Sequence, residues 1–155
     1  MPIQVVSGDL LDQKVEVVVN AWNRNLIPWW LLLPQGVSGA IKKRGGVKPF
    51  QELRKHGVLQ LGEAAVTSAG RLPFEAIIHV AGIGHFWRSS EKSVRKSVRS
   101  AIEKVQEHGF ESVAFPLIGA GTGGSPEKIE ALIRSEIESS GFEGESVIVR
   151  FSPNV

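Results

Sequence analysis

The sequence contains no cysteine among its 155 residues. This absence excludes disulfides, thiolate metal sites and a cysteine nucleophile, and it favours a cytoplasmic location. The first residues, MPIQVVSGDL, lack the basic and long apolar regions of a secretory signal. The most apolar run, LIPWWLLLP at 26–34, contains two prolines and is far too short to span a bilayer. We therefore expect a cytoplasmic protein without a membrane segment.

A large charge of one sign is also lacking, because 18 Lys and Arg residues face 16 Asp and Glu residues, for a net charge of +2. This balance permits anionic partners without requiring them. Hydrophobic residues make up 42% and charged residues 22% of the chain. Such a composition is that of an ordinary globular protein and excludes disorder. The length predicts a single domain over residues 1–155.

The order of patterns along the chain alternates between strands and helices. Short apolar or β-branched runs bounded by turn residues predict six strands, at 3–7, 15–20, 64–69, 75–81, 111–117 and 145–151. Apolar residues at helical spacing predict helices at 91–108 and from Pro126 to Gly141, with shorter helices over 37–44 and 49–56. The alternation indicates a mixed, mostly parallel sheet between two helical layers, which is an α/β/α fold.

The segment FPLIGAGTGGSP, at 115–126, carries four glycines in six residues between a predicted strand and a predicted helix. In an open α/β sheet this strand-to-helix loop lies at the carboxyl edge, where ligands bind. Glycines let backbone N–H groups approach an anion closely, and the helix start adds partial positive charge. A diphosphate fits this arrangement. The segment matches neither a Walker A loop nor a dinucleotide fingerprint. A flexible surface loop therefore stays open as the alternative to a diphosphate-binding loop.

Two further segments place polar residues at strand ends: SGDLL at 7–11 and VVVNAWNRN at 17–25. Four more motifs follow these two in a distinctive order: GVSGAI at 36–41, the pattern G-x-A-x-x-T-x-A-G-x-L-P from Gly62, IIHVAG at 77–82 and FPLIGAGTGG at 115–124. The whole set strongly resembles the macro domain family, over nearly the entire chain. Members of that family are ADP-ribose-binding modules with a three-layer α/β/α fold.

The resemblance implies a role for each matching residue. Asp9, with the Leu10 backbone beside it, would accept a hydrogen bond from the adenine amino group, as an acceptor-only carboxylate can. Asn23 would bind a ribose and is the candidate catalytic residue, while Asn20 is a further candidate ligand contact that is expected chiefly to hold the loop together. The loop residues would bind the diphosphate and Phe151 would flank the adenine. The remaining candidate ligand contacts are Gly36, Val37, Ser38, Ile118, Gly119, Ala120, Gly121, Thr122 and Gly123. For Asp9 and Phe151, a plain turn residue and a plain core residue stay open as alternatives.

The chain departs from the family pattern after its second asparagine. The segment at 24–36 is longer than the usual glycine-rich loop and carries Trp29 and Trp30, with Trp22 just before it. These tryptophans are candidates for an aromatic wall of the site. Packing against the protein itself, or a contact between two copies of the chain, remain as alternatives.

A second departure concerns catalysis. Many macro domains that remove ADP-ribose from proteins begin this helix with V-D-G-A-I-H, and the aspartate is assigned to water activation. Here Ser38 takes its place, and Gly123 replaces the loop aspartate of another branch of the family. A hydroxyl group does not act as a general base at neutral pH without an activator. The resemblance thus predicts ADP-ribose binding, free or on a modified macromolecule, and leaves hydrolysis of the ADP-ribosyl linkage open. No cofactor or metal is expected.

A histidine and a group of cations are further candidates for function. His79, in IIHVAG, lies within a predicted strand and is interpreted as a packed, hydrogen-bonded residue rather than a base. Cations at helical spacing, namely Arg88, Lys92, Arg95, Lys96 and Arg99, form a possible basic stripe. Such a stripe (88–99) favours an alternative function as a polyanion-binding module for nucleic acid or poly(ADP-ribose). A solvated helix face is its simpler interpretation.

Overall fold

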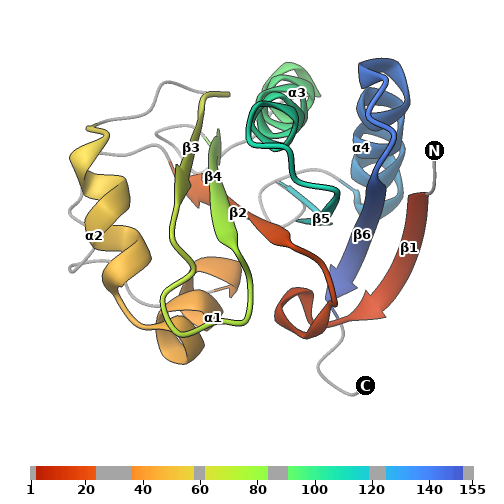
Figure 1. Cartoon of the computed structure of the whole chain (residues 1–155). Coiled ribbons are helices and arrows are strands. Elements are labelled where there is room, and N and C mark those ends of the chain that lie inside the picture. The colour runs from red at the N-terminus through yellow and green to blue at the C-terminus, as the bar shows by residue number, and fades with distance from the viewer. Residues whose placement is uncertain (1–2, 24–35, 58–61, 84–90, 119–124, 152–155) are drawn as a thin grey trace.

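The computed structural model describes residues 3–23, 36–57, 62–83, 91–118 and 125–151 (Figure 1). The chain order is β1 (Ile3–Gly8), a 3-10 turn η1 (Leu10–Asp12), β2 (Val17–Asn23), α1 (Gly36–Gly45), α2 (Lys48–Lys55), β3 (Ala64–Thr67), β4 (Ala76–Ile83), α3 (Glu91–Glu107), β5 (Ser112–Pro116), α4 (Pro126–Ser140) and β6 (Glu145–Phe151). Every predicted strand and helix is present, with ends shifted by three residues or fewer. The turn η1 was not predicted.

The strands form one six-stranded sheet in the order β1-β6-β5-β2-β4-β3. All neighbours run parallel except β3, which pairs antiparallel with β4 at the edge of the sheet. The carboxyl ends of β1, β6, β5, β2 and β4 therefore lie along the same edge. The predicted mixed, mostly parallel sheet is confirmed.

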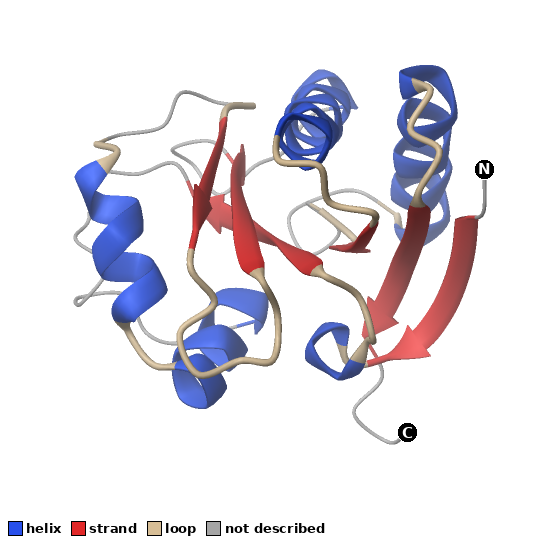
Figure 2. Cartoon of the chain, viewed as in Figure 1, coloured by secondary structure: helices blue, strands red, loops and turns tan. Residues whose placement is uncertain are grey.

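Helices cover both faces of this sheet (Figure 2). Alternate residues of the central strands point to opposite faces, so that Val17, Val19 and Phe115 pack against α3 and α4. Val18 and Ala114 instead pack in the cluster that holds Ile41, Phe50 and Leu53 of α1 and α2. Because both faces are covered, the strands are buried nearly continuously, as their apolar sequences indicate. The three-layer α/β/α fold is confirmed.

The helix α4 begins and ends where its sequence signals predict. The Ser125 side chain accepts a hydrogen bond from the Lys128 backbone N–H at 3.3 Å, and Pro126 occupies the first helical position. Gly141 follows the last turn with a φ of +75°, in the left-handed region that glycine enters at least cost. Ser125 and Pro126 thus fix the start of α4, which follows β5 in the chain, and Gly141 fixes its end.

Among the described residues, no helix is both long and apolar enough to cross a membrane.

Candidate functional site

The helices that follow β2 and β5 in the chain lie on opposite faces of the sheet. The chain leaves β5 for α4 and β6, whereas from β2 it continues to α1 and α2 on the other face. Since β2 and β5 are neighbours, this divergence makes a topological switch point at the carboxyl edge (Figure 1). Ligands of open α/β sheets bind in the crevice at such a point. Among the predicted site residues, Asp9 follows β1 at this edge, and Asn23 and Phe151 end β2 and β6 there.

Asp9 lies directly after β1 and caps the turn η1. Its Oδ1 accepts a hydrogen bond from the Leu11 backbone N–H at 2.9 Å, and its backbone oxygen accepts one from the Gln13 side chain. The Oδ2 atom lies 3.7 Å from Nη1 of Arg44, which also contacts Oδ1 of Asp12 at 3.2 Å. The Asp9 side chain keeps 35% of its surface exposed. A carboxylate fixed through one oxygen and exposed at the sheet edge can still accept a donor from a ligand.

The end of β2 carries an irregularity in its pairing with β4. Ala21 pairs with Val80, and Asn23 pairs with Ile83, so β4 has two residues where β2 has only Trp22. This shift of register resembles a β-bulge, a feature that often re-aims side chains next to functional sites. It places Asn23 at the carboxyl end of β2, at the switch point; only the backbone of Asn23 is described.

Asn20 has no exposed surface, so its side chain lies inside the protein rather than at the edge. Its amide nitrogen lies 3.0 Å from Nδ1 of His79, and Nε2 of His79 lies 2.8 Å from the Thr67 hydroxyl. The three side chains thus link β2, β4 and β3 under the edge-on ring of Phe50, whose centroid is 5.7 Å from that of His79. We assign Asn20 the supporting role rather than ligand contact.

Burial lowers the pKa of His79 to about 3, with a smaller contribution from the charge of His56. The imidazole is therefore neutral at physiological pH. A ring that is fully buried, and bonded through both nitrogens, has no access to a substrate proton. The interpretation of His79 as a packed, hydrogen-bonded residue is confirmed.

The polar chain continues from Thr67 to the surface of α2. The Thr67 hydroxyl donates to the Ser68 backbone oxygen at 3.0 Å, and the carboxylate of Glu52 accepts from the Ser68 backbone N–H at 3.1 Å and from its hydroxyl. The Ser68 hydroxyl bond is the main cause that lowers the pKa of Glu52. These bonds fasten the end of β3 to α2.

Ile118, two residues after the end of β5, is fully buried in the core against α3 and α4. The predicted phosphate loop, Gly119 to Gly123, lies outside the described residues, as do Trp29 and Trp30. Gly36, Val37 and Ser38 form the first turn of α1, Trp22 lies in β2 and Phe151 ends β6 at the same edge. Only the backbone of these five residues is described.

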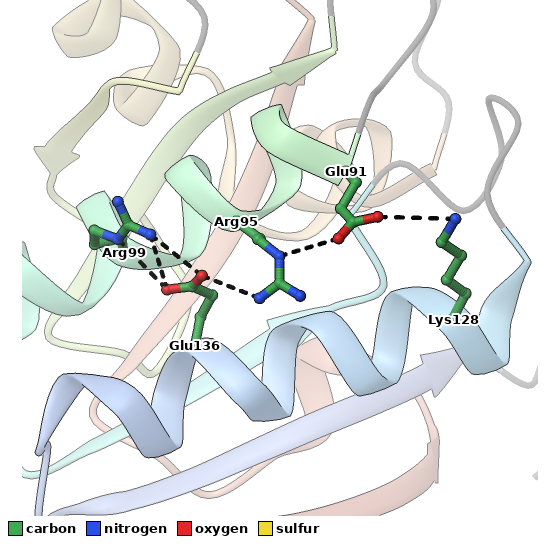
Figure 3. Close-up of polar contacts among 5 residues, drawn as sticks. All are labelled: Glu91, Arg95, Arg99, Lys128 and Glu136. Atoms are coloured by element: carbon green, nitrogen blue, oxygen red, sulfur yellow. Dashed lines mark hydrogen bonds and ion pairs between the residues drawn. The ribbon is translucent and has the colours of Figure 1, made fainter.

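The predicted basic stripe on α3 is paired in part inside the protein, and its first member, Arg88, lies outside the described residues. The carboxylate of Glu136, on α4, is nearly buried and accepts from Arg95 Nη1 at 3.2 Å and from Arg99 Nη2 at 3.3 Å. Arg95 also contacts Glu91, whose other oxygen lies 3.9 Å from Lys128 (Figure 3). Two of the five cations of the stripe therefore hold α3 to α4 instead of facing an outside anion.

Arg44 contacts the site residue Asp9, and Thr67 contacts the buried His79; neither was singled out from the sequence. Arg44 belongs to α1, and nothing in its spacing points to Asp9, 35 residues earlier. Thr67 does lie in the pattern G-x-A-x-x-T, which marks the position without revealing its partner. Among the described residues, no group of three or more His, Asp or Glu side chains could hold a metal ion.

The model of the Macro domain family matches residues 19–133 of this chain. A macro domain-containing protein of Caldanaerobacter subterraneus is 32% identical over 153 residues, covering 94% of this chain and 83% of that relative. An O-acetyl-ADP-ribose deacetylase of Escherichia fergusonii is 34% identical over 139 residues, covering 84% of this chain and 75% of the relative. A mutant macrodomain of Oceanobacillus iheyensis, solved with ADPR, superposes with a TM-score of 0.80 at 30% identity, over 97% of this chain and 85% of that one. The chain belongs to the macro domain family.

Proposed function

We propose that the chain binds ADP-ribose in the crevice at the carboxyl edge of its sheet, either free or as the terminal ADP-ribosyl group of a modified macromolecule. The observation that carries the proposal is the alignment of Asp9, the end of β2 and the start of α4 along this edge. The structurally similar macrodomain of Oceanobacillus iheyensis, solved with ADPR, supports it.

The ligand would run along the edge from β1 toward β2. Asp9 would accept the adenine amino group through Oδ2, since Oδ1 is held by the Leu11 N–H. The loop from Gly119 to Gly123 would bind the diphosphate, because it precedes a helix N-terminus whose orphan N–H groups favour anions. Asn23 would bind the ribose beyond the diphosphate, and Phe151 would flank the adenine.

Calorimetric titration with ADP-ribose tests this assignment. Asp9→Ala should weaken binding by about 1–3 kcal/mol, the range for a lost hydrogen bond to a charged group. Asp12→Ala is the matched control, because Asp12 contacts the same Arg44 but is not assigned to the ligand. Unchanged affinity in Asp9→Ala would remove the adenine assignment, and no binding by the wild type would remove the function.

Hydrolysis of an O-acetyl ester of ADP-ribose is a second candidate, favoured by the 34% identical relative that is named O-acetyl-ADP-ribose deacetylase. Water would attack the acetyl carbonyl, releasing acetate and ADP-ribose. Asn23 would position the water, because Ser38 stands where many members carry an aspartate. Chromatographic separation of ADP-ribose from its O-acetyl ester follows the reaction. Turnover by the wild type that falls in Asn23→Ala supports this role, whereas no turnover by either protein leaves a binding module.

A further inference from the structure

The charges of this chain are unevenly divided between its two helical layers. Residues 42–56, from the end of α1 through α2, contain six Lys and Arg residues and a single acidic residue, a net charge of +5 in a chain of net charge +2. Residues 125–145, which include α4, contain six acidic residues and two basic ones, a net charge of −4, and α3 in the same layer (91–107) has five basic residues and three acidic ones, a net charge of +2. Because α1 and α2 cover one face of the sheet and α4 the other, the segregation in sequence is also a segregation in space.

The cations of this layer, except Lys42 over the ring of Phe50, are exposed. Pro49, Phe50 and Leu53 are the buried residues of α2, which places Lys48 and Lys55 on the opposite side of the helix, two turns apart. Arg54 flanks them. Lys43 on α1 is exposed as well, and the exposed Arg71 lies on the loop between β3 and β4. The Arg71 guanidinium reaches Gly46, at the junction between α1 and α2, where a Cβ would lie 3.4 Å from its Nη1.

These cations carry charge that the protein itself does not neutralise by pairing. In the described part of the chain, no ion pair is formed by Lys43, Lys48, Arg54, Lys55 or Arg71. Lys48 and Lys55 lie near enough to Glu52 to lower its pKa slightly, and Glu52 is also bonded to Ser68. On α3, by contrast, Arg95 and Arg99 are both paired with the carboxylate of Glu136 (Figure 3).

Stabilisation of the helices explains only some of these residues. Arg54 and Lys55 lie in the last turn of α2, and Lys43 in the last turn of α1, where cations favour the negative end of the helix dipole. Lys48, however, begins α2, where the dipole disfavours a cation, and Arg71 belongs to no helix. A surface that gathers both kinds of residue is better explained by an external anion.

We infer that the α1–α2 basic face, defined as Lys43, Lys48, Arg54, Lys55 and Arg71, binds the phosphodiester backbone of a nucleic acid. A repeating backbone charge suits several unpaired cations spread over two helices and a loop. A membrane is disfavoured, because the apolar side of α2 is buried against the sheet and Val47 is the only large hydrophobic residue exposed among the described residues. Adjacent Arg44 contacts Asp9, so the face borders the carboxyl edge. The inference does not depend on ADP-ribose binding.

The test compares two triple variants that remove equal charge. Lys48→Gln/Arg54→Gln/Lys55→Gln alters the α1–α2 basic face, and Lys14→Gln/Lys92→Gln/Lys96→Gln removes three exposed cations elsewhere, two of them from α3. Fluorescence anisotropy measures binding of each protein to a labelled 20-nucleotide DNA strand over a range of NaCl concentrations. Thermal melting verifies that each variant is folded, and ADP-ribose titration reports on the separate site.

The wild type should bind the strand with an affinity that falls steeply with salt. The α2 variant should lose at least about tenfold in affinity at low salt, and the slope of log K against log salt should fall by about 2, since each strand phosphate contact contributes about 0.7. The control variant should bind within about twofold of the wild type. No binding by the wild type, equal losses in both variants, salt-independent binding, or binding to phosphatidylglycerol vesicles in place of DNA would each overturn the inference.

Discussion

The side-chain amide nitrogen of Asn20 lies 3.0 Å from Nδ1 of His79, and this contact fixes the protonation of the buried ring. The Thr67 hydroxyl donates its proton to the Ser68 backbone oxygen, so it accepts from His79 Nε2–H. Nδ1 is then left as the acceptor for the Asn20 amide. The ring is a neutral Nε2–H imidazole that joins three strands beneath the candidate site.

This neutral ring makes stability depend on pH. Because the pKa of His79 is about 3 in the folded protein and near 6.5 when unfolded, the unfolded state takes up the proton first as the pH falls. Stability is thus lost as the pH falls from 6.5 toward 3, by up to about 1.4 kcal/mol per pH unit. Urea unfolding of wild type and His79→Gln at pH 7, 6 and 5 measures this loss of unfolding free energy. The stability difference between the two proteins should shrink at lower pH; a constant difference would mean that His79 is not the linked group.

The pairing of Glu136 with Arg95 and Arg99 should contribute to stability. Glu136→Ala removes the shared acceptor of two guanidinium groups and should cost about 1–2 kcal/mol, below the full range for charged hydrogen bonds because both arginines are partly exposed. Glu138→Ala, on the exposed side of α4, should stay within about 0.5 kcal/mol of wild type. Chemical denaturation compares them, and equal losses in the two variants would deny Glu136 this role.

Gly70 is required by its surroundings as well as by its backbone. It has a φ of +60°, and a Cβ there would lie 2.3 Å from the backbone oxygen of Gly45, which accepts a hydrogen bond from Arg71. Gly70→Ala should therefore cost about 2–5 kcal/mol, from backbone strain and overpacking together. Gly141 has a similar φ but open space around it, so Gly141→Ala should cost only about 1–2 kcal/mol. Thermal unfolding that ranks Gly141→Ala as the more damaging change would contradict the close approach of this loop to α1.

Local signals in the sequence predict much of this architecture. Ser125, Pro126 and Gly141 mark the ends of α4 through capping chemistry that involves only neighbours in the chain. The alternation of Val17, Val18 and Val19 between two cores follows from a short apolar strand covered on both faces. The family resemblance then places Asp9 and Asn23 at strand ends, where the structure has them.

Contacts between distant residues are not visible in the sequence. Arg95 and Arg99 have the spacing of a solvated basic stripe, but the carboxylate that pairs with them lies about 40 residues later, on α4. The α1–α2 basic face was missed for the same reason, because Arg71 meets α1 only through the folding of the loop between β3 and β4. The shift of register between Val80 and Ile83 likewise depends on pairing with β2.

The most direct test of ADP-ribose recognition at this edge is a change of the base. Asp9 can only accept hydrogen bonds, so it should favour the 6-amino group of adenine over the 6-oxo group of hypoxanthine. Calorimetry with ADP-ribose and with inosine diphosphate ribose, on wild type and Asp9→Asn, measures this preference. The wild type should favour ADP-ribose by about 1–3 kcal/mol, and Asp9→Asn, whose amide can also donate, should lose most of that preference. Equal preference in both proteins, or none in the wild type, would contradict the account.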